Sequence, residues 1–229
     1  MKIKVCGMRD QENVSSLLAL KPDFVGFIFY NKSKRFATDF PQVKFPSTIK
    51  KVGVFVNETV EGIIDKVNKY QLDVVQLHGD ETAEFCQKLM NTFTELSQSS
   101  CTERSRSVIS TQLNHQIKTI KAFSVGENFD FNLTKPYEKY CDYFLFDTKG
   151  KEYGGNGIKF NWKILKNYNG SVPFLLSGGI SKEDSTEILS FLRRQESKLC
   201  IGLDINSGFE IEPALKDIEK IKEFKNNLI

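Results

Sequence analysis

Eight short, strongly apolar segments recur along this 229-residue chain and constrain its fold more than any other feature. The first surrounds Ile3 and Val5 and ends at Cys6-Gly7, and most of the others are nearly continuous runs of Val, Ile, Leu and Phe. Such runs are typical of parallel strands that are covered on both faces. The seven further strands are therefore predicted at 24–29, 51–56, 73–77, 117–123, 143–147, 172–177 and 199–204.

Between these segments, apolar residues recur at helical spacing within 15–20, 60–70, 82–90, 185–192 and 214–228. Eight strands that alternate mostly with helices predict a parallel α/β fold, and eight is the number that closes a (β/α)8 TIM barrel of about this length. A doubly wound sheet would carry Gly-x-Gly-x-x-Gly after its first strand, where this chain has CGMRD. We expect a single barrel domain over 1–229, with only a short or irregular helix in 124–140.

Two stretches do not follow this alternation of strands and helices. Residues 95–112 are crowded with Ser, Thr and Arg, which predicts a flexible insertion between the fourth helix and the fifth strand. Residues 191–199 form a smaller, basic insertion before the eighth strand. Both are helix-to-strand connections, which in a barrel lie on the face opposite the active site.

Charge and cysteine content exclude several classes of protein. The chain has 32 basic and 29 acidic side chains, a balance that argues against nucleic acid or an anionic membrane as partner. Its five widely spaced cysteines include no Cys-x-x-Cys pair, so neither a disulfide framework nor a metal site is expected. Because the sequence also has no long apolar run, we expect a cytoplasmic protein.

Polar residues gather where the predicted strands end, and in a barrel these ends meet at one mouth. Two of these ends, SGG at 177–179 and NSG at 206–208, are glycine-rich. Glycines allow close approach of the backbone, and the loops after strands 7 and 8 form a recurrent phosphate site in barrels. The other candidates at strand ends are Cys6, Arg35, Gln76, His78, Asp147 and Asp204.

Seven segments in order resemble the phosphoribosylanthranilate isomerase family of tryptophan biosynthesis. They are KVCG (4–7), VGFIFYNKSKR (25–35), VGVFVN (52–57), VQLHGDE (75–81), FDTKGKEYGGNG (146–157), LLSGGI (175–180) and GLDINSGFE (202–210). The resemblance covers the whole chain apart from the two insertions. The sequence departs from the family's usual pattern at Asn156, where a small Ser or Thr is more common.

The resemblance implies an isomerase without cofactor or metal. Its substrate would be N-(5-phosphoribosyl)anthranilate, which an Amadori rearrangement converts to 1-(2-carboxyphenylamino)-1-deoxyribulose 5-phosphate. Cys6 would be the catalytic base and Asp147 the acid, and Arg35 would bind the anthranilate carboxylate. The other implied substrate-binding residues are Gln76, His78, Gly155, Ser177, Gly178, Gly179, Asp204, Ser207 and Gly208. A structural role fits Gln76 and His78 equally well, and the protein would be a monomer or homodimer.

Two alternatives remain open from the sequence. Other phosphosugar barrels of tryptophan or histidine synthesis fit less well, since they would want a lysine in place of Asn57 or an aspartate in place of Cys6. A ligand-binding barrel that has lost catalysis is the second alternative.

Overall fold

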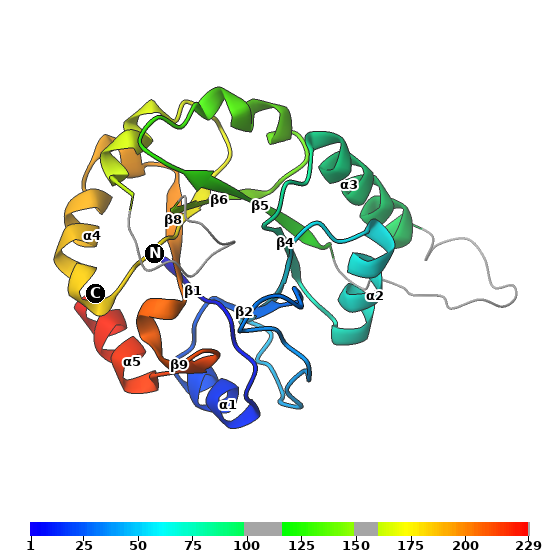
Figure 1. The fold of residues 1–229 in the computed structure, drawn as a ribbon, viewed down its shortest axis with the longest axis horizontal. Helices are drawn as coiled ribbons and strands as arrows, with labels where there is room; N and C mark the ends of the chain where they lie inside the picture. The colour runs from blue at the N-terminus through cyan, green and yellow to red at the C-terminus, as the bar shows by residue number, and fades with distance from the viewer. Residues whose placement is uncertain (99–115, 149–159, 229) are drawn as a thin grey trace, which may run out of the picture.

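The fold is a closed barrel of eight parallel strands, seen along its axis in Figure 1. The structure is a computed structural model that describes residues 1–98, 116–148 and 160–228. The first strand pairs with both the second and the eighth, which closes the ring and confirms the predicted TIM barrel. The strands are β1 (Lys2–Val5), β2 (Phe24–Ile28), β3 (Lys50–Phe55), β4 (Val74–Leu77), β5 (Lys118–Val125), β6 (Tyr143–Thr148), β7 (Phe174–Leu176) and β8 (Cys200–Ile205).

Helices surround the strands (Figure 1) and cover their outer faces. They are α1 (Gln11–Ala19), α2 (Val60–Tyr70), α3 (Ala83–Gln98), α4 (Ser185–Leu192) and α5 (Ile218–Asn227). Local signals fix their ends: in α2, the Thr59 side chain accepts the Gly62 N–H, and Gln71 ends the helix in a left-handed conformation. The connection after β5 holds only a 3-10 helix, η2 (Phe131–Tyr137), as predicted for 124–140. The connection after β6 includes a second 3-10 helix, η3 (Trp162–Asn167).

The strands separate two apolar cores. Alternate side chains such as Val25 and Phe27 point outward and pack under the helices, while Phe24 packs in the barrel interior with residues of the other strands. On β1 the same alternation places Ile3 and Val5 in the outer core and Cys6 in the inner one. The interior is thus a packed core rather than a pore.

Regular secondary structure extends into both predicted insertions. Helix α3 runs to Gln98, so residues 95–98 are helical and do not form the flexible loop that was expected there. Buried Leu89 and Phe93 and the partly buried Leu96 continue one apolar stripe, which holds this last turn against the core. Residues 99–112 lie outside the described residues. The second stretch, 191–199, completes α4 and then forms the 3-10 turn η5 (Gln195–Ser197) before β8.

The last unit contains an element that the sequence did not predict. After the 3-10 turn η6 (Ser207–Phe209), strands β9 (Glu210–Glu212) and β10 (Leu215–Lys216) form a small antiparallel ribbon. Helix α5 therefore begins only at Ile218, where Asp217 caps it by accepting the Lys220 N–H. Within the described ranges, no helix combines the length and apolarity needed to cross a membrane.

Candidate active site

The predicted site residues meet in one pocket at the carboxyl ends of the strands. Every one of them that falls in the described residues lines this pocket, and Gly155 lies outside those residues. Tyr30 and Thr148, for which no role was predicted from the sequence, also border it. The predicted residues brought together are Cys6, Arg35, Gln76, His78, Asp147, Ser177, Gly178, Gly179, Asp204, Ser207 and Gly208.

Cys6 follows β1 and lines the pocket. Its backbone N–H donates to Ile205 O at 2.9 Å, which continues the β1–β8 pairing to the mouth. The side chain is almost completely buried, and burial raises the pKa of the thiol above its ordinary value. The nearby ammonium of Lys4 is the strongest opposing influence. A proton-accepting thiolate at this position therefore depends on its positive neighbours.

Asp147, at the carboxyl end of β6, is held from two sides. Its Oδ1 accepts the Thr148 N–H at 2.8 Å, and its Oδ2 lies 3.3 Å from His78 Nε2. Gln76 Nε2 lies 2.8 Å from His78 Nδ1, so donation by this amide assigns the ring proton to Nε2, facing Asp147. His78 thus both lines the pocket and orients the carboxyl group. The other amide atom, Gln76 Oε1, is buried and has no protein partner within the described residues.

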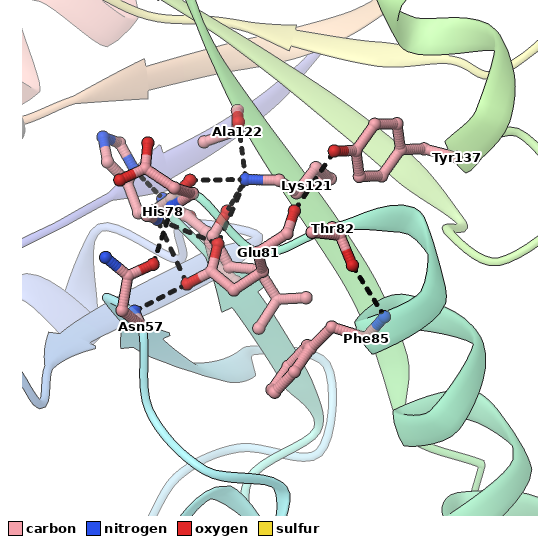
Figure 2. Close-up of polar contacts among 12 residues, drawn as sticks. Asn57, His78, Glu81, Thr82, Phe85, Lys121, Ala122 and Tyr137 are labelled. Atoms are coloured by element: carbon pink, nitrogen blue, oxygen red, sulfur yellow. Dashed lines mark hydrogen bonds and ion pairs between the residues drawn. The ribbon is translucent and has the colours of Figure 1, made fainter.

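The loop that carries His78 is fixed by a network of hydrogen bonds around the Lys121–Glu81 ion pair (Figure 2). The Lys121 ammonium donates to Glu81 Oε2 at 3.1 Å, to Gly79 O at 2.8 Å and to Ala122 O at 3.1 Å. Glu81 Oε1 in turn accepts the backbone N–H of Asn57 at 2.8 Å. This network ties β3, β4 and β5 together just outside the barrel mouth.

The glycine-rich loops after β7 and β8 form one wall of the pocket. Gly178 and Gly179 have φ values of +91° and +63°, which other residues rarely adopt. A Cβ on Gly178 would lie 2.1 Å from Thr148 Oγ1, and one on Gly208 would lie 2.2 Å from Ile180 O. Only glycine fits at either position. The loop after β7 therefore lies close to Thr148, and the loop after β8 lies close to the backbone at Ile180. Such exposed backbone amides suit a phosphate.

Arg35 enters the pocket from the loop after β2 as part of an ion-pair cluster. Its Nε and Nη2 donate to the Glu210 carboxylate at 2.7–3.1 Å, so it is anchored rather than solvated. Lys216, which is buried, donates to the same carboxylate at 2.5 Å and to Asn206 Oδ1 at 2.9 Å. Burial raises the pKa of Glu210, but its hydrogen bond with Arg35 and the charge of Lys216 outweigh this and hold the pKa below its usual value.

A buried ion pair lies directly beneath Cys6. The β1–β8 register places Lys4 opposite Asp204, and Lys4 Nζ lies 2.8 Å from Asp204 Oδ1. Burial lowers the pKa of Lys4, but the charges of Asp204 and Cys6 outweigh this effect and raise it, so the ammonium stays protonated. No role was predicted for Lys4 from the sequence. The available signal was its even spacing from Cys6, which places both side chains on the same face of the strand.

The comparisons with known proteins agree with this arrangement. A model of the family described as N-(5'phosphoribosyl)anthranilate (PRA) isomerase matches residues 3–103 and 101–227. The chain is 43% identical to the N-(5'-phosphoribosyl)anthranilate isomerase of Parabacteroides distasonis (100% of this chain, 94% of that protein). It is 40% identical to that of Phocaeicola vulgatus (100% and 98%).

Solved structures give the same assignment. The structure of phosphoribosyl anthranilate isomerase from Thermotoga maritima is similar with a TM-score of 0.77 at 32% identity, over 100% of this chain and 98% of that one. Another, a complex of the isomerase with reduced 1-(o-carboxyphenylamino)-1-deoxyribulose 5-phosphate, has a TM-score of 0.74 at 29% identity with the same coverage. With a closed eight-stranded barrel, a glycine-walled pocket and relatives matched along its whole length, this chain belongs to the phosphoribosylanthranilate isomerase family.

Proposed function

We propose that this protein isomerises N-(5'-phosphoribosyl)anthranilate, with Cys6 as the catalytic base and Asp147 as the acid. The observation that carries the proposal is their joint placement: both line one pocket, from β1 and β6, and the glycine loops of β7 and β8 lie between these strands in the ring. A sugar whose phosphate is bound by those loops would present its C1–C2 region to both groups.

The proton transfers follow from this placement. Protonated Asp147 gives its proton to the furanose ring oxygen, the C1–O bond breaks, and the nitrogen lone pair forms the C1=N iminium. The Cys6 thiolate then removes the proton from C2, and the electrons of the C2–H bond form a C1=C2 bond that neutralises the iminium. Tautomerisation of the resulting enol gives the aminoketose. Protons pass between the substrate and these two side chains, while bonds between heavy atoms change only within the substrate.

The remaining side chains support binding and orientation. The Nε2–H of His78 points at Asp147 Oδ2 and holds that carboxyl group toward the pocket. Arg35 uses Nε and Nη2 for Glu210, so Nη1 is the nitrogen that would meet the anthranilate carboxylate. Gln76 Oε1, which is buried and has no hydrogen-bond partner in the part of the chain that the structure describes, would accept a hydrogen bond from a sugar hydroxyl.

Turnover of phosphoribosylanthranilate by the purified protein tests the activity, and complementation of a tryptophan auxotroph lacking this isomerase tests it in cells. Cys6→Ser and Asp147→Asn should each lower kcat by at least about 10²-fold with little change in thermal stability. Cys200→Ser is a matched control, because Cys200 lies at the amino end of β8, away from the pocket. Unchanged rates in both site variants would reject the mechanism.

A further inference from the structure

The Lys4–Asp204 pair is the most deeply buried charged group that the proposed reaction leaves without a role. Lys4 is fully buried and Asp204 is 5% exposed, in the centre of a barrel whose other inward side chains are mostly apolar. Burying two ions removes them from water, and an apolar pair of similar size is often as stable. A purely structural purpose therefore accounts poorly for charges at this position.

The geometry places the Lys4 ammonium next to the Cys6 sulfur. Residues 4 and 6 lie on the same face of the chain, one layer apart. A Cβ added at Gly26, on the neighbouring strand, would lie 2.9 Å from Cys6 Sγ and 3.3 Å from Lys4 Nζ. Both atoms therefore lie against the backbone of Gly26, at a position where a side chain would collide with the sulfur.

We propose that Lys4 is a positioning residue for proton transfer at Cys6: its ammonium, held by Asp204, is the counter-ion of the Cys6 thiolate. The inference rests on the proposed role of Cys6 as base. An ammonium has three N–H donors, so Lys4 can bind Asp204 and a thiolate at the same time. When Cys6 ionises, its proton leaves to water, and Lys4 keeps all of its protons. Asp204 fixes the position of the ammonium, which lies 2.8 Å from its Oδ1.

Other charged groups also face Cys6. Among the described residues, Lys4 comes from β1 and Asp204 from β8, while Lys216 of β10 and Arg35 of the β2 loop approach from the side of Gly7. His78 and Asp147 lie across the pocket, on the β4 and β6 ends. Lys4 opposes the effect of burial on the thiol more strongly than any other group, and Asp204 acts against it. Removing Lys4 should therefore raise the pKa of the thiol, and removing Asp204 should lower it.

The test measures ionisation of the Cys6 thiol without substrate, so it is independent of whether Cys6 is the catalytic base. Thiolate absorbance is recorded against pH for each variant and for the same variant carrying Cys6→Ser, and the difference isolates Cys6 from the other cysteines. Lys4→Met should lower the thiolate fraction at a fixed pH by about tenfold or more. Asp204→Asn should raise it, and the pH at which kcat/KM rises should move with the pKa of the thiol.

Lys121→Met is the matched control, since it breaks a second buried lysine–carboxylate pair outside the barrel and should leave the Cys6 titration unchanged. If Lys4→Met does not fold, comparing Asp204→Asn with Lys4→Met/Asp204→Asn measures the same effect without a buried unpaired carboxylate. A lower thiolate fraction in the double variant supports the role of Lys4. Equal titrations with and without Lys4 overturn it, whereas full activity of Cys6→Ser would instead reject the proposed role of Cys6 as catalytic base.

Discussion

Breaking the Lys121–Glu81 ion pair should cost far more stability than breaking a surface pair of the same length. The two side chains of this pair are 4% and 2% exposed, with nitrogen and oxygen 3.1 Å apart. Lys121→Met keeps the aliphatic stem but leaves Glu81 as a buried, unpaired carboxylate. Loss of one partner of such a pair costs about 3–5 kcal/mol. For a domain of this size that corresponds to a fall in Tm of roughly 6–20 °C.

The chain provides a control at equal distance. Lys50 Nζ also lies 3.1 Å from its partner, Asp73 Oδ1, but Lys50 is 47% exposed. Lys50→Met should therefore cost less than about 1 kcal/mol, as exposed pairs do. Urea denaturation of both variants gives the two free energies of unfolding. Equal costs would refute the reasoning that burial, rather than the contact itself, sets the value.

A double-mutant cycle separates the pair from its surroundings. Glu81→Gln keeps an oxygen for the Asn57 N–H but places an amide against the Lys121 ammonium. Combining it with Lys121→Met removes both charges. The double variant should therefore lose less unfolding free energy than the sum of the losses in the two single variants. Additive costs would mean that the two charges do not interact in the folded protein.

Further predictions concern the pocket. Gly178→Ala should raise KM by at least about tenfold, because its φ of +91° and the contact with Thr148 Oγ1 exclude a Cβ, while Gly62→Ala in α2 should leave KM unchanged. Arg35→Ala should mainly raise KM; an effect on kcat alone would contradict its assignment to the anthranilate carboxylate. The value of kcat/KM should rise as pH increases through the Cys6 pKa, which burial raises, and a flat profile would argue against a thiolate base. Because the pKa of Glu210 is held below its ordinary value of about 4.3, its stabilising ion pairs are present above that pH and are lost as pH falls through the folded-state pKa. Glu210→Gln should therefore reduce the acid dependence of the free energy of unfolding.

Much of this fold is visible in the sequence, because parallel strands covered on both faces leave nearly uninterrupted apolar runs. All eight predicted strands are present, and β7 is shorter than expected because Pro173, which has no N–H to donate to a ladder, precedes it. The end of α3 was missed because Ser, Thr and Glu residues around Leu96 mask its apolar stripe. That stripe is evident once the helix is placed against the core.

The candidate site was also only partly predictable from the sequence. Strand ends converge in any barrel, so Cys6, His78 and Asp147 could be placed at one mouth from their positions alone. Their partners could not. Arg35 binds Glu210, which lies 175 positions later in the sequence. Glu210 belongs to the β9–β10 ribbon, which no local sequence pattern predicts. The pairing of Lys4 with Asp204 depends on the β1–β8 register, which only closure of the ring determines.

The close approach of Gly208 to Ile180 O has a consequence for engineering. Since the turn after β8 rests on the backbone that follows β7, neither turn can be enlarged or exchanged by itself without colliding with the other. A redesign that admits a substrate with a bulkier anionic end must transplant both turns as one cassette, and libraries that randomise either turn alone should yield mostly misfolded barrels.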